Sequence, residues 1–120
     1  MPKIVDKLKI YIKPTCTTCK KALEKLTDKG QNFESVNYYE EKFTKQKIKV
    51  ILDKIDVEPG EILRKMEKSY KELELGKRDL TKNELIDLLY QNPDLIQRPI
   101  IEIGDRFYLG RPVDKLDKIL

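Results

Sequence analysis

The sequence contains no histidine, and only two of its 120 residues are cysteine. Without histidine the chain cannot form a Cys–His dyad, a Ser–His–Asp triad or a histidine-ligated metal site. Two cysteines alone do not complete a tetrahedral zinc site. We therefore expect no metal site. A reactive thiolate would have to be stabilised by a helix terminus or by lysine and arginine side chains.

Long apolar runs are also absent. No run approaches the ~20 residues that cross a bilayer, and residues 1–7 lack the apolar core of a signal peptide. In a protein without an export signal, a pair of cysteines does redox chemistry more often than it forms a structural bridge. We expect a cytoplasmic protein that does not bind a membrane.

Charge of one sign is not in large excess. The 25 basic and 21 acidic residues give a net charge of +4 and are spread along the chain. Such a distribution is typical of solvated helix faces rather than of a nucleic-acid-binding surface. We expect no direct contact with nucleic acid. The length indicates one domain, residues 1–120, and we expect a monomer.

Both cysteines lie in one stretch, Cys16-Thr17-Thr18-Cys19. It follows an apolar-alternating run at residues 8–12 and opens a helical pattern at residues 15–28. The free N–H groups and positive dipole of a helix start favour a thiolate. Cys16 is therefore the predicted nucleophile and Cys19 the predicted resolving thiol. The alternative is two buried thiols that only fill space. A disulfide across two residues closes too small a loop to stabilise the fold much, which favours a reversible switch.

The remaining patterns predict an α/β order. Strands are expected at 33–38, 100–103 and 106–109, with a Gly104-Asp105 turn between the last two. Helices are expected after Thr44, after Pro59 (with Ile62, Leu63 and Met66), after Thr81, and at the end with Val113, Leu116, Ile119 and Leu120. The order β-α-β, helices, β-β-α describes a thioredoxin-like fold. Its mixed four-stranded sheet would carry a helical insertion at about residues 44–92.

Three motifs resemble the ArsC/Spx family of thioredoxin-fold proteins over about residues 8–120. They are the strand–Cys16-Thr17-Thr18-Cys19–helix unit, Asn92-Pro93-Asp94-Leu95-Ile96-Gln97-Arg98-Pro99-Ile100-Ile101, and Leu109-Gly110-Arg111-Pro112. The resemblance implies that Cys16 attacks arsenate and that Arg98 and Arg111 hold the oxyanion. It also implies that Pro99 is cis and lies beside the active-site sulfur.

Two features depart from the reductase branch of the family. A third family arginine falls on Gly60 in our alignment, and Arg64, about one helical turn further on, is the only nearby substitute. Cys19 is unusual in dedicated reductases, although Spx regulators carry the CxxC. Arg111-Pro112, in turn, is not general in Spx proteins.

The sequence therefore predicts a thiol–disulfide oxidoreductase similar to arsenate reductases. The alternatives are a Spx-like redox-sensing regulator that binds RNA polymerase, and a member of the family that has lost catalysis. No metal, flavin or nucleotide motif is present, so we expect no tightly bound cofactor. The electrons would come from glutathione, glutaredoxin or thioredoxin, and the substrate would be a small oxyanion or a thiol compound.

Several predicted site residues also have ordinary structural interpretations. Arg98 could pair with Asp94 at the surface, and Arg111 could be solvated. Lys13 and Thr15 flank Cys16 and could assist by charge or by hydrogen bonding. We expect the polar neighbours of the cysteines to leave the site exposed. Tyr38 is interpreted as a sheet residue.

Overall fold

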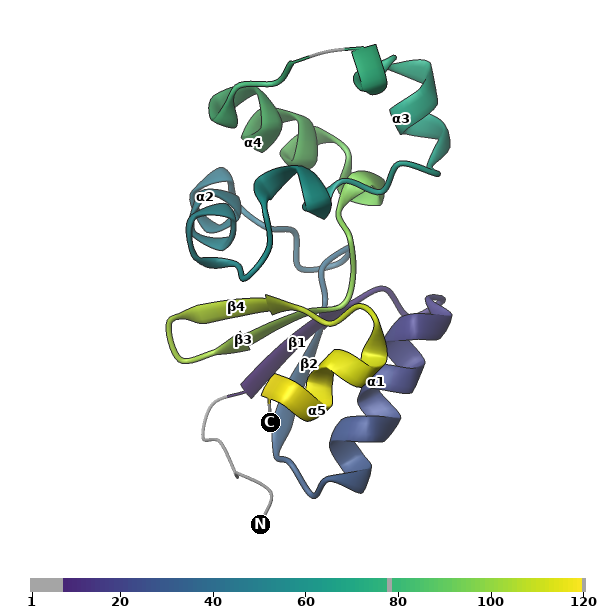
Figure 1. The fold of residues 1–120 in the computed structure, drawn as a ribbon, viewed down its shortest axis with the longest axis vertical. Helices are drawn as coiled ribbons and strands as arrows, with labels where there is room; N and C mark the ends of the chain where they lie inside the picture. Colours follow the sequence, from purple (N-terminus) through teal and green to yellow (C-terminus); the bar gives the residue numbers. More distant parts are fainter. Residues whose placement is uncertain (1–7, 78, 120) are drawn as a thin grey trace.

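A four-stranded sheet with helices on both faces forms the protein, described here by a computed structural model over residues 8–77 and 79–119 (Figure 1). The strands are β1 (Leu8–Ile12), β2 (Phe33–Asn37), β3 (Ile100–Ile103) and β4 (Arg106–Leu109). The α-helices are α1 (Thr17–Asp28), α2 (Lys45–Lys54), α3 (Lys68–Glu72), α4 (Lys82–Gln91) and α5 (Leu116–Ile119). Short 3₁₀ helices are η1 (Pro59–Ile62), η2 (Leu75–Lys77), η3 (Pro93–Leu95) and η4 (Val113–Lys115).

The sheet has the order β2-β1-β3-β4 and is mixed. β1 pairs with β2 in parallel, Ile10 lying opposite Ser35, and α1 makes the crossover between them. β3 is antiparallel to both β1 and β4. The four strands, the crossover and the terminal hairpin confirm the predicted thioredoxin-like α/β arrangement.

Successive strand residues contribute to two separate cores because their side chains alternate between the sheet faces. On the face covered by α1 and α5, Ile10 and Ile101 pack against Ala22, Leu26 and Leu116. Each of these side chains is almost completely buried. Burial of one such leucine or isoleucine contributes about 1.5–3 kcal/mol, so this small core can hold both helices to the sheet.

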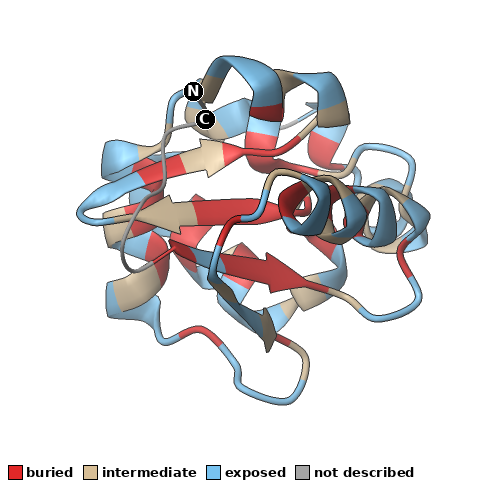
Figure 2. Ribbon diagram, turned by 90° about the horizontal axis from the view of Figure 1, so that it is seen from below, coloured by how far each residue is buried: buried red, intermediate tan, exposed pale blue. Residues whose placement is uncertain are grey.

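The opposite face of the sheet carries α2 and α4. Tyr11 of β1, Ile100 of β3 and Phe107 of β4 belong to the core that these helices complete. Figure 2 shows the buried residues concentrated along the strands and on the helix sides that meet them, with exposed residues outside. The segment 44–92 is helical and covers this second face, above the sheet in Figure 1.

Local capping signals fix three helix boundaries as predicted. Thr44 caps α2 by accepting the Lys47 N–H. Thr81 and Glu84 form a reciprocal capping box at α4. After α1, Gly30 adopts a φ of +69°, a conformation that glycine accepts without strain. Gly104 likewise turns the hairpin between β3 and β4 with a φ of +61°.

The prediction of a helix after Pro59 is wrong beyond the first turn. Only η1 forms, because the chain then becomes extended and Leu63 makes an isolated antiparallel bridge to Ile96. Met66, expected on an apolar helix face, is 83% exposed. In the C-terminal stripe, Leu116 is buried and Val113 and Ile119 are partly buried, whereas Leu120 lies outside the described residues.

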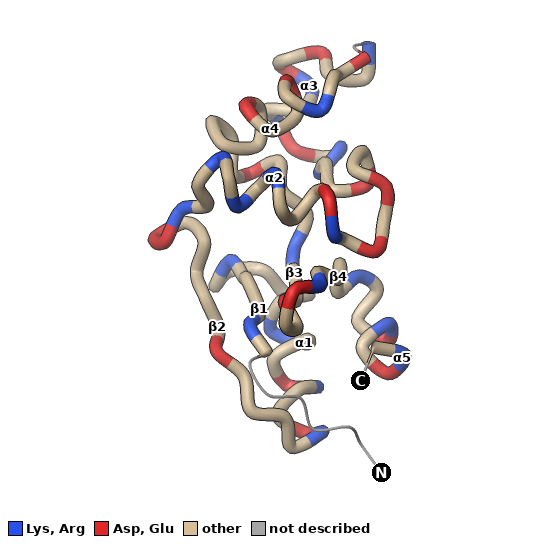
Figure 3. Tube along the Cα trace, turned by 90° about the vertical axis from the view of Figure 1, so that its left-hand side faces the viewer, with Lys and Arg blue, Asp and Glu red and all other residues tan. Residues whose placement is uncertain are grey.

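Basic and acidic residues are interspersed over the helices and loops (Figure 3). Many meet across elements as ion pairs, such as Lys25 with Asp117 at 2.8 Å and Lys45 with Asp87 at 3.0 Å. Each exposed ion pair of this kind contributes little to the free energy of folding, so these pairs do not determine the fold.

Candidate active site

Four chain segments meet at one edge of the sheet. β1 and β2 are parallel, so the residues that follow both strands lie at the same edge. β3 runs in the opposite direction, which brings Arg98 and Pro99, just before it, to that edge. β4 is parallel to β1, so Gly110 and Arg111 arrive there as well. Strand direction alone therefore gathers the predicted site residues.

Cys16 is the N-cap residue of α1. Its sulfur accepts the Cys19 backbone N–H at 3.4 Å, and its own N–H donates to the Lys13 carbonyl at 2.9 Å. Both cysteines are free thiols, and their accessible fractions are 9% for Cys16 and 1% for Cys19. Cys16 is thus less exposed than its polar neighbours suggested, although Thr15 and Thr17 are exposed. Cys16 is the cysteine that retains a path to solvent.

The two thiols have opposite protonation tendencies. Burial opposes the Cys16 thiolate, but the Cys19 thiol and N–H, together with Arg98, outweigh burial and hold the pKa of Cys16 below its usual value. Burial and the neighbouring Cys16 raise the pKa of Cys19 to about 12. Cys16 therefore loses its proton more readily than Cys19, as a nucleophile and a resolving thiol require.

Arg98 is not a surface arginine. The residue is only 6% exposed, and the positive charge of its side chain helps to lower the pKa of Cys16. Its Nη1 donates to the Tyr38 hydroxyl at 3.4 Å. Its Nε is buried and has no hydrogen-bond partner within the described part of the chain. Asp94, the alternative partner, instead accepts a hydrogen bond from Tyr39. A buried guanidinium with an unused donor is suited to receive an anion next to the sulfur.

Pro99 is buried, and the Arg98–Pro99 peptide bond is cis, as the resemblance implied. Gly110 packs directly on it: a Cβ at position 110 would lie 2.9 Å from Pro99 Cγ. The Gly110 N–H also donates to the Pro99 carbonyl at 2.8 Å. This close approach places Arg111, whose Nη1 donates to the Arg98 carbonyl at 3.0 Å. Arg111 thus adjoins Arg98.

Lys13 and Thr15 differ in what the structure gives them. Lys13 Nζ lies 4.9 Å from the centre of the Tyr39 ring, a cation–π contact at the edge of the site. Its backbone also lowers the pKa of Cys19. Thr15 lies in the turn before α1 and is exposed. The structure therefore places the Lys13 ammonium over the Tyr39 ring and leaves Thr15 at the surface.

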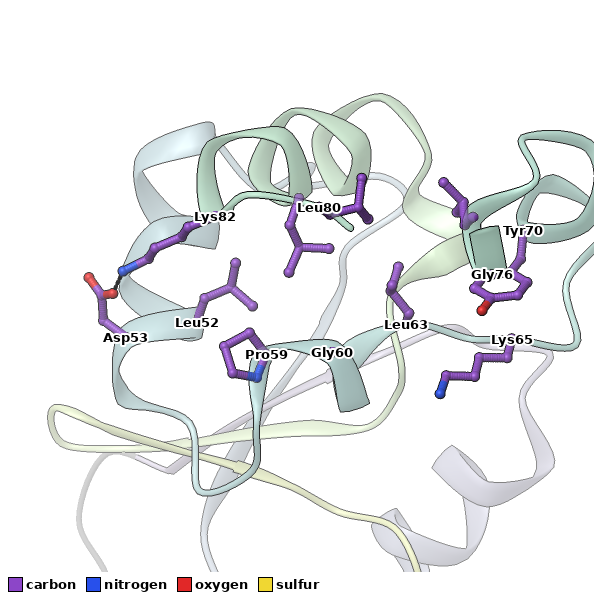
Figure 4. A pocket seen from close by; sticks show the side chains of 12 residues that line it. Leu52, Asp53, Pro59, Gly60, Leu63, Lys65, Tyr70, Gly76, Leu80 and Lys82 are labelled. Atoms are coloured by element: carbon purple, nitrogen blue, oxygen red, sulfur yellow. Dashed lines mark ion pairs between the residues drawn. The ribbon is translucent and has the colours of Figure 1, made fainter. Parts of the chain in front are cut away.

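Gly60 and Arg64 lie in different surroundings. Gly60 lines a pocket of about 650 Å³ among the helices of segment 44–92 (Figure 4). Apolar side chains dominate this pocket, including Leu52, Leu63 and Leu80. Arg64 is joined by its backbone N–H to the Leu95 carbonyl at 2.8 Å. It is among the groups that influence the pKa of Tyr38. Arg64, rather than Gly60, is near the Arg98 segment.

Sequence reasoning missed Tyr38 and Tyr39 as site residues. Tyr38 is 1% exposed and its hydroxyl contacts both Arg98 and the Ile96 carbonyl. Tyr39 lies between the Lys13 ammonium and Asp94. Their position directly after β2, at the same sheet edge as Cys16, is the signal that could have identified them.

Among residues 8–77 and 79–119, no group of three or more histidine, cysteine or acidic residues could hold a metal ion. No helix in the described part of the chain has the length and apolar character needed to span a bilayer.

Comparisons with known proteins agree on one family. The ArsC family model matches residues 11–119. The global transcriptional regulator Spx of Lactiplantibacillus plantarum is 32% identical, over 92% of this chain and 84% of its own. The regulatory protein MgsR of Bacillus subtilis is 29% identical, over 95% and 90%. The solved arsenate reductase from Vibrio cholerae superposes with a TM-score of 0.88 at 27% identity, covering 97% of this chain and 99% of that one. The chain belongs to the ArsC family.

Proposed function

We propose that this protein is a thiol-dependent oxidoreductase whose nucleophile is the Cys16 thiolate. The observation that carries the proposal is the position of Cys16 as N-cap of α1, where its sulfur accepts the Cys19 N–H and the buried Arg98 helps to lower its pKa. Helix dipole, Cys19 N–H and guanidinium all favour negative charge on that sulfur. The similarity to an arsenate reductase structure supports the same class of chemistry.

With a disulfide or a glutathione adduct as substrate, the Cys16 thiolate attacks one sulfur and the other leaves as a thiolate, which takes a proton from solvent. Cys19, after losing its proton, then attacks the Cys16 sulfur and expels the second thiol. The substrate gains two electrons, and the protein is left with a Cys16–Cys19 disulfide. Two external thiols restore both cysteines and are themselves oxidised to a disulfide.

Arsenate is the narrower substrate. Cys16 sulfur would bond to arsenic while an arsenate hydroxyl takes a proton and leaves as water. A second thiol, Cys19 or glutathione, then attacks the Cys16 sulfur. The electron pair of the S–As bond stays on arsenic, so As(V) becomes As(III) and arsenite departs. Arg98 and Arg111 would hold the oxyanion. Arg64 could replace the family arginine missing at Gly60 only by leaving Glu67, which its Nε contacts at 2.9 Å.

The chain would need no tightly bound cofactor for this cycle. We place the reaction in the cytoplasm, where glutathione, glutaredoxin and thioredoxin keep thiols reduced. Lys13 would add positive charge at the rim of the site, over the Tyr39 ring. We assign the buried Pro99 to the wall beside the sulfur. We keep Thr15 as a candidate hydrogen-bonding residue, since it is exposed next to Cys16 and open to a bound substrate. We further propose that the protein works as a monomer.

Arsenate turnover, measured separately with glutathione plus glutaredoxin and with thioredoxin, tests the proposal. Activity should vanish in Cys16→Ser. In Cys19→Ser, glutathione should still attack the Cys16 sulfur of the arsenate adduct, which releases arsenite and leaves a Cys16–glutathione disulfide that mass spectrometry detects. Turnover that persists without Cys16 contradicts the proposed nucleophile. An ordinary Cys16 pKa of about 8.5, together with no reducible Cys16–Cys19 disulfide, contradicts the whole redox assignment.

A redox-sensing regulator is the second candidate. It is favoured by the similarity to Spx and MgsR and by the two adjacent free thiols. In that case the Cys16–Cys19 disulfide would change the affinity for RNA polymerase rather than carry electrons to a substrate. Co-purification with RNA polymerase that depends on oxidation, combined with no turnover by either donor, would favour the regulator.

A further inference from the structure

Tyr38 is fixed at the sheet edge by its backbone and by two rings. It follows β2 directly, and its N–H donates to the carbonyl of Ile12, the last residue of β1, at 3.4 Å. Phe43 stacks on the Tyr38 ring with centroids 5.4 Å apart and an interplanar angle of 13°. Tyr39 packs on it at 5.0 Å in a tilted arrangement. The ring therefore has little freedom to reorient its hydroxyl.

The Tyr38 hydroxyl makes two contacts, and both go to the segment before Pro99. It donates its proton to the Ile96 carbonyl at 3.4 Å, which leaves a lone pair to accept Arg98 Nη1 at 3.4 Å. A hydroxyl has only one proton, so the first contact orients the second. Burial raises the pKa of Tyr38, which keeps the hydroxyl protonated in this role.

Arg98 has few other contacts to hold it in place. Its Nε lacks a partner in the described part of the chain, and its positive charge acts on Cys16 by lowering the pKa of that thiol. A guanidinium that contacted the sulfur alone could turn about its flexible stem. The Tyr38 oxygen supplies a second fixed point.

We propose that Tyr38 is a positioning residue that holds the Arg98 guanidinium against the Cys16 sulfur. It touches neither cysteine through a hydrogen bond and takes no part in bond making. The role rests on the proposed function of Cys16 as a thiolate nucleophile. Loss of the Tyr38 hydroxyl alone should weaken the thiolate while the aromatic packing remains.

The test is Tyr38→Phe, which removes one oxygen and keeps the ring. The Cys16 pKa is read from the pH dependence of iodoacetamide alkylation at Cys16, followed by mass spectrometry. We expect an upward shift of roughly one unit, or about tenfold less thiolate well below the pKa. The matched control is Tyr11→Phe. Tyr11 is also buried, but its hydroxyl donates to Glu102, so the Cys16 pKa should not move.

A double-mutant cycle with Arg98→Met separates positioning from a general structural effect. In the Arg98→Met background, Tyr38→Phe should produce no further shift, because the guanidinium it positions is gone. A full shift in that background, or no shift in the single variant, overturns the proposal. An ordinary Cys16 pKa in the unsubstituted protein would instead overturn the proposed function itself.

A measurement on the unsubstituted protein applies even where Tyr38→Phe does not fold. A guanidinium held at two points should not flip freely, so the NMR signals of the Arg98 Nη protons should be separate. A single averaged signal, like that of a solvated arginine, overturns the positioning role.

Discussion

Two polar clusters lie at the sheet and have opposite hydrogen-bonding character. The Tyr11 cluster consists of Tyr11, Lys47, Glu102 and Phe107. The Tyr11 hydroxyl and Lys47 Nζ donate to Glu102 at 2.6 and 2.7 Å. Lys47 also lies over the Tyr11 and Phe107 rings, 5.6 and 5.1 Å from their centres. Each charge in this cluster has a close partner.

The Cys16 cluster consists of Cys16, Cys19, Tyr38 and Arg98, and its hydrogen bonds are longer and incomplete. Its contacts of 3.4 Å leave Arg98 Nε without a partner in the described part of the chain. A hydrogen-bond network in which every group has a partner stabilises a fold. A buried donor without a partner costs free energy, and such donors occur where a ligand can supply the missing hydrogen bond. The contrast assigns stability to the Tyr11 cluster and chemistry to the Cys16 cluster.

The largest expected effect is the difference in alkylation rate between the two cysteines of the Cys16 cluster. In the reduced native protein near neutral pH, iodoacetamide should alkylate Cys16 at least ~1000-fold faster than Cys19. The reason is that the pKa of Cys16 lies below its usual value, while the pKa of Cys19 is about 12 and its thiol is 1% exposed. Peptide mapping of the alkylated protein measures both rates. Comparable rates at the two cysteines would break the contrast between them.

Arg98→Met should raise the Cys16 pKa by about one to two units, because it removes the adjacent positive charge. Alkylation of Cys16 near neutral pH should slow ten- to a hundredfold, and turnover should fall at least as much. Stability should change little or increase, since a buried charge with an unused donor is lost. Arg106→Met, at an exposed arginine of β4, is the control and should leave both properties unchanged.

Lys47→Met should have the opposite effects to Arg98→Met: it should lower the stability of the fold and leave the Cys16 pKa unchanged. It leaves Glu102 with only the Tyr11 hydroxyl, so the free energy of unfolding should fall by about 1–2 kcal/mol in urea titrations. The Cys16 pKa should stay where it is. A shift in that pKa would mean that the two clusters are coupled and that the division of roles is wrong.

The Tyr11 cluster should also set part of the acid sensitivity. Burial opposes the Glu102 charge, but Lys47 and Tyr11 outweigh it and hold the pKa of Glu102 below its usual 4.5. Because the pKa of Glu102 is lower in the folded state, its ionised carboxylate stabilises the fold at pH values above its pKa in the unfolded chain. This stabilisation is lost as the pH falls through the pKa of Glu102 in the folded protein. Unfolding free energy should therefore decline below about pH 4.5. This decline should be smaller in Glu102→Gln.

Thr15→Ala should have the smallest effect. The side chain is exposed, and surface substitutions of this kind change free energies by about 0.5 kcal/mol or less. Alkylation of Cys16 should stay within about twofold of the unsubstituted rate. A tenfold change in the rate of Cys16 alkylation would show that Thr15 takes part in activating Cys16.

Features that depend on neighbouring residues in the sequence were predictable. The caps at Thr44 and Thr81, the turn glycines and the strand–CxxC–helix unit are local signals, and each formed where expected. Arg98 and Arg111 came from resemblance, and strand direction then explained why they lie at the same sheet edge as Cys16. The sequence alone gave no distance between these segments.

The errors arose where tertiary contacts override local pattern. The apolar spacing of Ile62, Leu63 and Met66 predicts a helix, yet pairing of Leu63 with Ile96 extends the chain. Tyr38 was interpreted as an ordinary sheet residue, because its role at the site depends on Arg98, which lies sixty positions away in the sequence. Nothing within a window of local sequence reports such a contact.

Gly110 carries a consequence for how this site tolerates mutation. It contributes no functional group, yet a single methyl group there would lie within 2.9 Å of Pro99 Cγ and 3.3 Å of Ile101 Cδ1. To make room, the end of β4 would have to move off Pro99, and Arg111 would move with it. The smallest change available to the chain, one hydrogen replaced by a methyl, would thus separate the two arginines of the site without altering either of them.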